Sequence, residues 1–322
     1  MACFLGIDTS NYTTSLAIYD DETGEMLQAK MPLPVKENEI GLRQSDAVFH
    51  HTKNLPELME KCFPNNKKIA AAGVSVKPRD AQGSYMPCFL AGEGLARSVC
   101  AMGSIDLHKT SHQTGHILAA IFSCKKFEFL KQRFVAFHVS GGTTECLLVE
   151  PDEDKVVKIS LIASSLDLKA GQAVDRIGVF MGLRFPCGPE MEELALESKK
   201  EYNIKPAMKG LDCCLSGIEN KCRDMLLKNE KKEDVAKYCI DYIGKAVEEM
   251  TAGVLNEYGK LPVVYAGGVM SNLLIRKRIL NRFEAYFANP EYSCDNAAGV
   301  AFFAALKHKE KTNEQYPYGF AD

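Results

Sequence analysis

The chain has 322 residues, of which 46% are hydrophobic and 25% charged, and its formal net charge at pH 7 is −3. These values are typical of a globular protein and exclude a disordered chain, and the length favours two lobes rather than one. The slightly acidic balance argues against an autonomous nucleic-acid-binding protein, although it permits a nucleic acid held at a local basic patch.

The cysteine content and the apolar runs indicate the compartment. Twelve cysteines occur without a C-x-x-C pair or a signal peptide, which favours a reducing environment in which most of them are buried thiols. No uncharged apolar run approaches the roughly 20 residues that a membrane span needs. We therefore expect a cytoplasmic protein with no membrane association.

The first predicted element is a β-hairpin over residues 4–20, and it recurs 130 residues later. "FLGIDTSNYTTSLAIYD" and "FVAFHVSGGTTECLLVE" align without a gap, and each reads as apolar strand, small polar turn, apolar strand. The repeat predicts two related lobes, each opened by a hairpin. The coinciding residues are Phe4/Phe134, Ser10/Ser140, Thr13/Thr143 and Thr14/Thr144.

The tips of the two hairpins are rich in serine, threonine, glycine and asparagine. Such tips expose N–H groups and hydroxyls, which suit phosphate or carboxylate oxygens. The first tip is equally consistent with an ordinary tight turn. The second carries Gly141 and Gly142, which allow a ligand to approach the backbone closely.

The next elements are a helix over 44–59, a buried strand over 69–76 and helices over 94–104 and 112–122. His112 and His116 lie four residues apart in the first turns of the last helix, so both imidazoles face one side. That spacing suits a metal site, but two exposed or capping histidines would have it as well.

Beyond the second hairpin, a helix is predicted over 167–183, with Val174, Ile177 and Met181 inward and Asp175 on another face. "RFPCGP" breaks the chain. The longest predicted helix spans 233–258 and carries an apolar stripe typical of a core helix.

"LPVVYAGG" predicts a buried strand that leads through Gly267 and Gly268 to a helix over 271–280. A strand, a double glycine and a helix N-terminus form a cradle for a nucleotide, although αβ units also need glycine at their turns. The last such junction contains Asp295 and Asn296, either of which could cap the final helix. Alternating strands and helices with duplicated hairpins predict an α/β protein of two lobes around a cleft.

With these elements in order, nearly the whole chain resembles the tRNA threonylcarbamoyladenosine synthase family, once called O-sialoglycoprotein endopeptidase. The resemblance implies the fold of actin, sugar kinases and Hsp70-type ATPases, with two ribonuclease-H-like lobes around a nucleotide cleft. Residues 1–130 would form the first lobe, with 300–322 packing back on it, and 131–299 the second. Seven motifs carry the resemblance in the family's order: "GIDTS", "SHQTGH", "HVSGGTT", "LDLKAGQAVDRIG", "CLSGIEN", "YAGGVMSN" and "YSCDNAAGVA".

The resemblance also implies two binding sites. A divalent metal, iron or zinc, would be held by His112, His116 and Asp295, and this ligand set leaves coordination positions open. An adenine nucleotide, threonylcarbamoyl-AMP or ATP, would contact the second hairpin tip with its phosphate or carboxylate oxygens and Asp175 and Gly188 with its adenosine or ribose. The expected nucleotide residues are Val139, Ser140, Gly141, Gly142, Thr143, Asp175, Gly188, Gly267, Gly268 and Asn272.

The implied activity is transfer of a threonylcarbamoyl group to an adenosine next to the anticodon of tRNA. The metal would polarise the carbamoyl oxygen or orient the phosphate, and no nucleophilic side chain is required. Expected partners are tRNA and the proteins of a threonylcarbamoyl-transfer complex, and a dimer is possible.

The chain departs from the family pattern at three places: Asn11-Tyr12-Thr13 replace acidic residues, Lys77–Pro87 replace Gly-Pro-Gly-Leu, and Thr143 replaces His or Asn. The first-lobe wall expected to face the acceptor is therefore altered. Two alternatives follow: a paralogue with a different carbamoyl acceptor, or a non-catalytic nucleotide-binding regulator of the true transferase. The retained metal residues favour an enzyme. A basic helix around Arg276, Lys277, Arg278 and Arg282 is either a phosphate contact or a solvated face.

Overall fold

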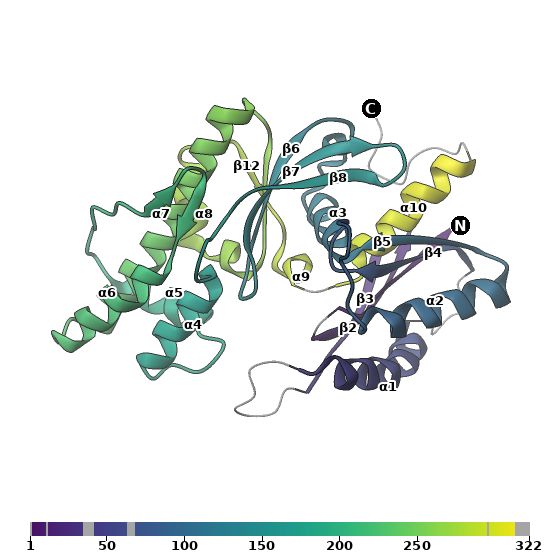
Figure 1. Ribbon diagram of the computed structural model, residues 1–322, viewed down its shortest axis with the longest axis horizontal. Helices are drawn as coiled ribbons and strands as arrows, with labels where there is room; N and C mark the ends of the chain where they lie inside the picture. Colours follow the sequence, from purple (N-terminus) through teal and green to yellow (C-terminus); the bar gives the residue numbers. More distant parts are fainter. Residues whose placement is uncertain (1, 11, 35–41, 63–67, 295, 313–322) are drawn as a thin grey trace. The chain divides into compact units, whose positions relative to one another are not determined.

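The structure is a computed structural model that describes residues 2–10, 12–34, 42–62, 68–294 and 296–312 (Figure 1). Its contacts divide the chain into two compact units. The first contains the described residues within 1–132, 151–159 and 291–322, and the second contains residues 133–150 and 160–290. The segments 151–159 and 291–299, which the sequence analysis assigned to the second lobe, group with the first unit.

The first unit is built on a five-stranded sheet. Its strands lie in the order β3(Met26–Pro32), β2(Thr13–Asp20), β1(Cys3–Asp8), β4(Ile69–Lys77), β5(Asp106–Ser111). The hairpin strands β1 and β2 pair antiparallel from Cys3 opposite Asp20 to Asp8 opposite Ser15, and β1, β4 and β5 run parallel. β1 is buried along its whole length, as expected of a central strand, whereas the edge strand β3 is partly exposed.

A second five-stranded sheet, most of which belongs to the second unit, repeats this order. Its strands are β8(Val156–Ser164), β7(Thr144–Asp152), β6(Phe134–Val139), β11(Val263–Ala266) and β12(Ala285–Phe287). The hairpin strands β6 and β7 pair antiparallel, and β6, β11 and β12 run parallel. The rings of Phe137, Tyr265 and Phe287 stack across these three parallel strands with centroids 5.0 Å apart. Two hairpins predicted from a short repeat are thus confirmed, and the likeness extends to whole sheets.

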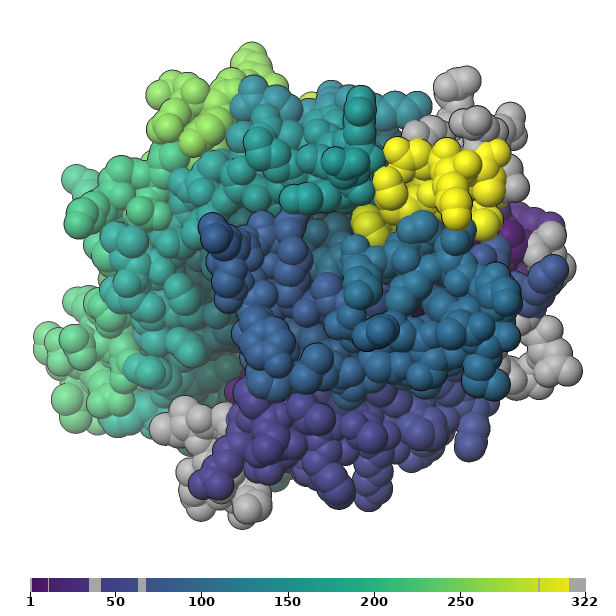
Figure 2. Space-filling model, turned by 45° about the vertical axis from the view of Figure 1, so that its right-hand side comes forward, coloured from purple at the N-terminus to yellow at the C-terminus, as the bar shows by residue number. Residues whose placement is uncertain are grey.

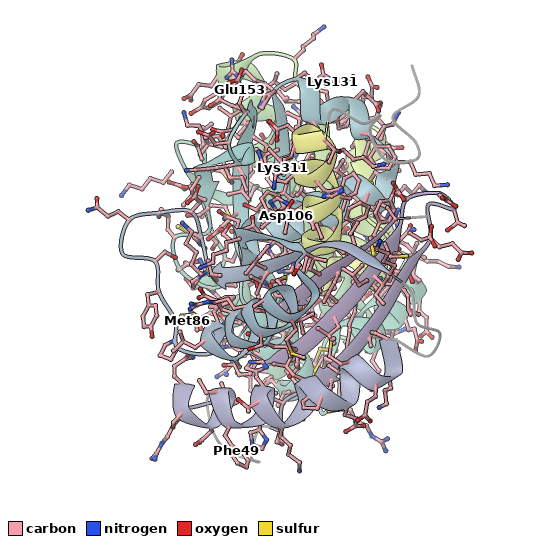
Figure 3. The ribbon with its side chains drawn as sticks, turned by 90° about the vertical axis from the view of Figure 1, so that its right-hand side faces the viewer. Phe49, Met86, Asp106, Lys131, Glu153 and Lys311 are labelled. Carbon is pink, nitrogen blue, oxygen red and sulfur yellow. The ribbon has the colours of Figure 1, made fainter. Side chains whose placement is uncertain are left out.

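Four helices of the first unit flank its sheet: α1(Gln44–Cys62), α2(Phe89–Gly103), α3(His112–Cys124) and α10(Ala298–Thr312). α10 packs directly on the central strand, because a Cβ built on Gly6 would lie 2.4 Å from the backbone nitrogen of Ala301. Figure 2 shows α10, in yellow, beside the blue surface formed by chain that precedes residue 130. Lys311 of α10 pairs with Asp106 of β5 at 2.8 Å (Figure 3). The short elements of this unit are η1(Phe127–Lys131) and α9(Pro290–Ser293).

The helices of the second unit are α4(Ala170–Phe180), α5(Gly188–Glu197), α6(Ser216–Leu227), α7(Lys232–Tyr258) and α8(Leu273–Leu280), and β9(Ala207–Lys209) pairs with β10(Asp212–Cys214). The apolar stripe of α7 is buried in the core, as predicted. Two expectations were wrong in detail. The helix predicted over 167–183 is confined to α4, because Asp167 and Leu168 are held in a loop by side-chain bonds of that aspartate. The double glycine leads first into a short 3₁₀ helix, η2(Gly268–Ser271), before α8 begins.

All twelve cysteines lie in the described part of the chain, none of them forms a disulfide, and most are buried. Among the described residues, no helix combines the length and the apolar character needed to cross a bilayer.

Candidate metal and nucleotide sites

The two histidines that the sequence singled out converge in the first unit. β5 runs directly into α3, and Ser111 caps this helix by accepting the N–H of Thr114 at 3.1 Å. His112 and His116 then fall one helical turn apart, and their Nε2 atoms lie 2.9 Å from each other. His116 is buried and the side chain of His112 is 19% exposed. Two ring nitrogens directed at one point are an arrangement that can hold a metal ion.

Asp8 completes this cluster; it lies within the "GIDTS" motif but was not among the predicted site residues. Its Oδ2 lies 2.9 Å from His112 Nδ1 and accepts the Ser75 hydroxyl at 2.5 Å, while its Oδ1 accepts the Ser10 N–H at 2.9 Å. Complete burial alone would raise the pKa of this carboxyl, but His112 and the hydrogen bonds from Ser10 and Ser75 hold it well below its usual range. Asp8 is therefore ionised at neutral pH.

These donors fit a divalent transition metal. Histidine ligands commonly donate the N–H of their second ring nitrogen to a carboxylate, and Asp8 stands in that position toward His112. The third expected ligand, Asp295, lies outside the described residues. Among the residues that the structure does describe, no group of three His, Cys, Asp or Glu side chains is placed to hold a metal. The pair His112 and His116 is thus brought together, and the third ligand stays a prediction.

The start of α10 lies close to the histidine helix. A Cβ built on Gly299 would lie 1.8 Å from the carbonyl oxygen of Gly115, the residue directly before His116. Asn296 accepts the N–H of Ala298 at 3.0 Å and so caps α10, as the sequence allowed.

In the second unit, the second hairpin tip forms a tight, internally bonded loop. Ser140 N–H donates to the Thr143 carbonyl at 2.7 Å, and Thr143 N–H donates to the Ser140 hydroxyl at 3.2 Å. The tip packs on the start of α4, where a Cβ at Gly171 would lie 2.6 Å from the Gly141 nitrogen. By contrast, a Cβ on Gly141 or Gly142 would meet no described atom within 4 Å, so this backbone is open to a ligand.

A cavity of about 380 Å³ lies beside this tip, within the second unit. That volume lies in the range of small-molecule sites. The N-terminal ends of α5 and α8 open onto it, and such ends favour anions. The sequence analysis predicts ten nucleotide-binding residues. Five of them line this cavity: Gly141, Asp175, Gly188, Gly268 and Asn272.

The other five predicted residues lie outside the lining. Val139 is buried under Gly267, and Ser140, Gly142 and Thr143 belong to the hairpin tip next to Gly141. Their part in binding remains a prediction.

Asp175 faces the cavity from α4. Its Oδ1 accepts the Cys187 N–H at 2.8 Å, which holds the loop before α5 in place, and burial raises the pKa of its carboxyl. A second acid, Glu192, also lines the cavity and accepts the Leu273 N–H at 2.6 Å, where it bonds the first residue of α8. The sequence gave no reason to expect Glu192 there, because it lies 81 residues from its partner.

The altered segments of the first unit are ordered where they are described. Tyr12 is 41% exposed, and Thr13 closes the first hairpin through its N–H, which donates to Ser10 O at 3.1 Å; Asn11 lies outside the described residues. In the Lys77–Pro87 segment, Asp80 accepts from Lys77 and Lys155 at 2.6 Å each, and these bonds lower the pKa of its carboxyl.

The basic helix does not present a free row of cations. Arg278 and Arg282 of α8 and its end bind Glu248 of α7 at 3.2 and 2.6 Å, and the Arg276 guanidinium lies over the Phe287 ring. These partners favour the role of a structural surface over that of a phosphate contact.

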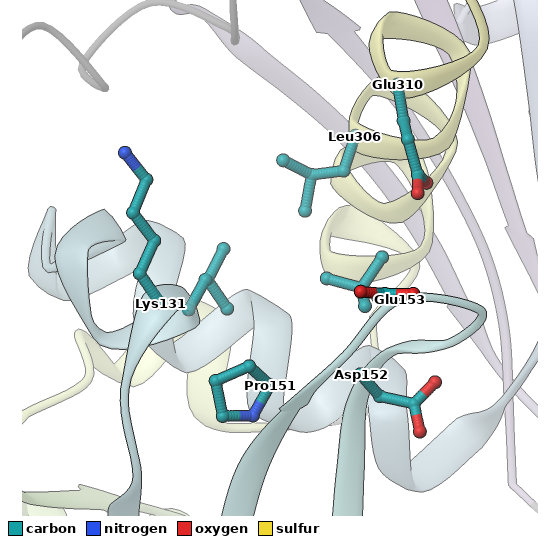
Figure 4. A pocket seen from close by; sticks show the side chains of 8 residues that line it. Lys131, Pro151, Asp152, Glu153, Leu306 and Glu310 are labelled. Atoms are coloured by element: carbon teal, nitrogen blue, oxygen red, sulfur yellow. The ribbon is translucent and has the colours of Figure 1, made fainter.

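A cavity of about 410 Å³ in the first unit contains none of the predicted residues. Figure 4 shows Lys131 on one side of it and Glu153 and Glu310 on the other, with Leu306 between Lys131 and Glu310.

Comparison with known proteins identifies relatives of the whole chain. Residues 36–302 match the family model described as tRNA N6-adenosine threonylcarbamoyltransferase. The protein of that name from Buchnera aphidicola (subspecies Schizaphis graminum) is 26% identical over 97% of this chain and 94% of its own length. The one from Sulfurihydrogenibium sp. strain YO3AOP1 is 29% identical over 95% of this chain and 91% of its own.

Solved structures agree on the fold. Full-length HypF in its phosphate- and nucleotide-bound form superimposes with a TM-score of 0.60 at 14% identity, and the chain covers 56% of its length. Component A of the (R)-2-hydroxyglutaryl-CoA dehydratase of Acidaminococcus fermentans gives 0.57 at 16% identity, over 96% of this chain and 99% of that one. The predicted α/β fold of the actin, sugar-kinase and Hsp70 class is confirmed.

Proposed function

Because the chain belongs to the tRNA N6-adenosine threonylcarbamoyltransferase family, we propose that it transfers a threonylcarbamoyl group from threonylcarbamoyl-adenylate to an adenosine of tRNA next to the anticodon. In this reaction the N6 amine attacks the carbamoyl carbon, the bond to the phosphate oxygen breaks, and AMP leaves as the amine loses a proton. The acceptor is thus a tRNA, and the protein acts in the cytoplasm.

The main support from the structure is the cavity of the second unit. It gathers Gly141, Asp175, Gly188, Gly268 and Asn272 from four separate parts of the chain around a volume suited to a small ligand. We assign it to the adenylate. Open backbone at Gly141 and Gly268 and the helix N-termini would receive its phosphate, and the Asp175 carboxylate would accept hydrogen bonds from ribose hydroxyls.

We assign one iron or zinc ion to His112 and His116, with Asp295 as the third ligand. When bound, a metal with open positions supplies Lewis acidity for the carbamoyl oxygen or orients the phosphate. The protein's own part is to hold the two imidazoles with their Nε2 atoms at one point. That Asp8 is ionised keeps the local charge favourable for a cation.

The decisive experiment is reconstitution. The purified protein is incubated with tRNA, threonine, bicarbonate, ATP and an adenylate-forming enzyme, with and without the other proteins of a threonylcarbamoyl-transfer complex. The nucleosides are then analysed by mass spectrometry. We expect threonylcarbamoyladenosine in the complete mixture and much less of it with Gly268→Leu protein.

Two outcomes would redirect the assignment. If the complete mixture gives no product but the protein stimulates a separate transferase, the protein is a regulator. If threonylcarbamoyl-AMP is consumed and the threonylcarbamoyl group appears on a molecule other than tRNA, the acceptor is not tRNA.

A further inference from the structure

We propose that Asp8 is the positioning residue of the metal site: it fixes the tautomer of His112 so that the ring presents an unprotonated Nε2 to the metal. The inference rests on the metal assignment above. It concerns a residue of the first strand, 104 positions away from the histidine that it orients.

The contacts of Asp8 determine which side of the His112 ring donates. The Asp8 carboxylate already accepts the Ser10 N–H and the Ser75 hydroxyl, and its Oδ2 lies 2.9 Å from His112 Nδ1, so we infer that Nδ1 donates to it. When the ring is neutral, a proton on Nδ1 leaves Nε2 with its lone pair. This Nε2 lies 2.9 Å from His116 Nε2, at the point to which the metal is assigned.

Asp8 is itself held on every side. It is fully buried at the end of β1, and Ser75 of the neighbouring strand β4 and the Ser10 N–H both donate to it. The next residue, Thr9, donates its hydroxyl to the Cys88 carbonyl at 3.0 Å and accepts the Gly92 N–H of α2 at 3.2 Å. Because the Asp8 carboxylate is buried and already held by Ser75 and the Ser10 N–H, it can orient the His112 ring with little further loss of entropy, which a solvent-exposed carboxylate could not.

The test compares Asp8→Asn with Asp20→Asn in the full-length protein. Asp20 is an equally buried carboxylate of the same hairpin, but it accepts bonds from Cys3, Glu22 and Thr23 at the opposite end. Zn²⁺ affinity is measured by competition with a chelator, and the His112 tautomer is read from ¹⁵N chemical shifts of the metal-free protein. We expect Asp8→Asn to weaken Zn²⁺ binding by about 10–100-fold and to lose the pure Nδ1–H tautomer. Asp20→Asn should change neither.

Ser75→Ala is a milder second variant, because it removes one donor to Asp8 and leaves the Asp8–His112 bond. We expect it to weaken Zn²⁺ binding less than Asp8→Asn does. The proposal is overturned if His112 of the wild-type protein carries its proton on Nε2, and this measurement needs no variant to fold. It is also overturned if Asp8→Asn and Asp20→Asn lose Zn²⁺ equally. If the wild type binds no Zn²⁺, Co²⁺ or Fe²⁺ while the tautomer responds as expected, the metal assignment fails and the orientation of His112 by Asp8 stands.

Discussion

Gly267 lies against the backbone of Val139, so that a Cβ built on it would come within 2.2 Å of the Val139 carbonyl oxygen. Its φ of +99° is one that side chains rarely adopt. Strand β11 therefore passes into the turn that carries Gly268 and Asn272 only if position 267 has no side chain. This contact ties the turn to the second hairpin.

We expect Gly267→Ala to destabilise the protein by about 2 kcal/mol or more, from backbone strain and overpacking together. Urea unfolding followed by circular dichroism measures this. A loss below about 0.5 kcal/mol, the usual size for surface changes, would show that the turn relaxes around the new methyl group.

Gly268→Leu should leave stability unchanged and weaken ligand binding instead. A Cβ there meets no described atom within 4 Å, yet the residue lines the cavity, so the fold should be unaffected while the ligand space shrinks. We expect AMP binding to weaken by about tenfold or more, equivalent to about 1.4 kcal/mol, as measured by calorimetry. The control is Gly94→Leu, which also places its side chain in open space but lies in the other unit. Gly210→Leu is unsuitable as a control, because the φ of Gly210 is +63°. Unchanged AMP affinity in Gly268→Leu protein would remove this cavity as the nucleotide site.

The histidine pair predicts metal content. His112→Ala/His116→Ala protein should lose its bound transition metal, because the remaining carboxylate cannot hold one alone. Elemental analysis after purification without chelators measures the change. His50→Ala, on α1 and outside the cluster, should retain the wild-type metal content. Equal metal in the double variant and the wild type would contradict the assignment.

Local patterns carried much of the fold. The two hairpins, the strand at 69–76 and the long helix α7 were predictable, because alternation and helical periodicity are properties of neighbouring residues. The parallel pairing of β1 with β4 was not, since it joins residues more than 60 positions apart. The short 3₁₀ helix after Gly267 was not predicted for a different reason: we attribute its conformation to the contact between Gly267 and Val139 rather than to its own sequence.

The site shows the same division. His112 and His116 can be predicted as a pair because one helical turn separates them. Asp8 acquires its role only when β1 and α3 are folded together. The phosphate role considered for Arg278 and Arg282 loses support, because their partner Glu248 lies a full helix earlier and no sequence spacing links them. The role of a polar residue cannot be predicted from a single sequence when its partner lies far away along the chain.

His51 predicts how stability depends on pH. It is fully buried on α1, with Nδ1 at 2.8 Å from the Thr14 hydroxyl, and burial lowers its pKa from 6.5 to about 4. Between these values the unfolded chain binds a proton that the folded protein does not, so stability should fall as the pH decreases from about 6.5 towards 4. The pKa difference limits this contribution to about 3 kcal/mol.

The measurement is the free energy of unfolding at pH 7.5 and pH 5 for wild type and His51→Gln. The glutamine does not titrate, so the variant should lose less stability on acidification than the wild type. A pH dependence that is the same in both proteins would mean that His51 is protonated in the folded state or that other groups dominate.

The acceptor wall gives the last prediction: without partner proteins this chain should modify tRNA poorly even when it binds the adenylate well. Where the family carries acidic residues, Tyr12 and Thr13 supply only hydroxyls, and these are not useful bases near neutral pH. If the acids of the family assist removal of the amine proton, their absence would cost on the order of 10²–10⁴-fold in rate. Thr13 is only partly exposed but Tyr12 is accessible, so Tyr12→Asp is the better restoration.

We expect Tyr12→Asp to raise the rate of threonylcarbamoyladenosine formation in the reconstituted mixture that lacks partners. Phe49→Asp, at an exposed aromatic residue of α1 in the same unit, is the control for added negative charge. AMP affinity should be the same in all three proteins, since the cavity that we assign to the nucleotide lies in the second unit. Robust product from the unaltered chain alone would show that the two hydroxyls are no handicap. The changes at Asn11-Tyr12-Thr13 would then carry no information about the acceptor, and the case for a divergent paralogue would lose its principal support.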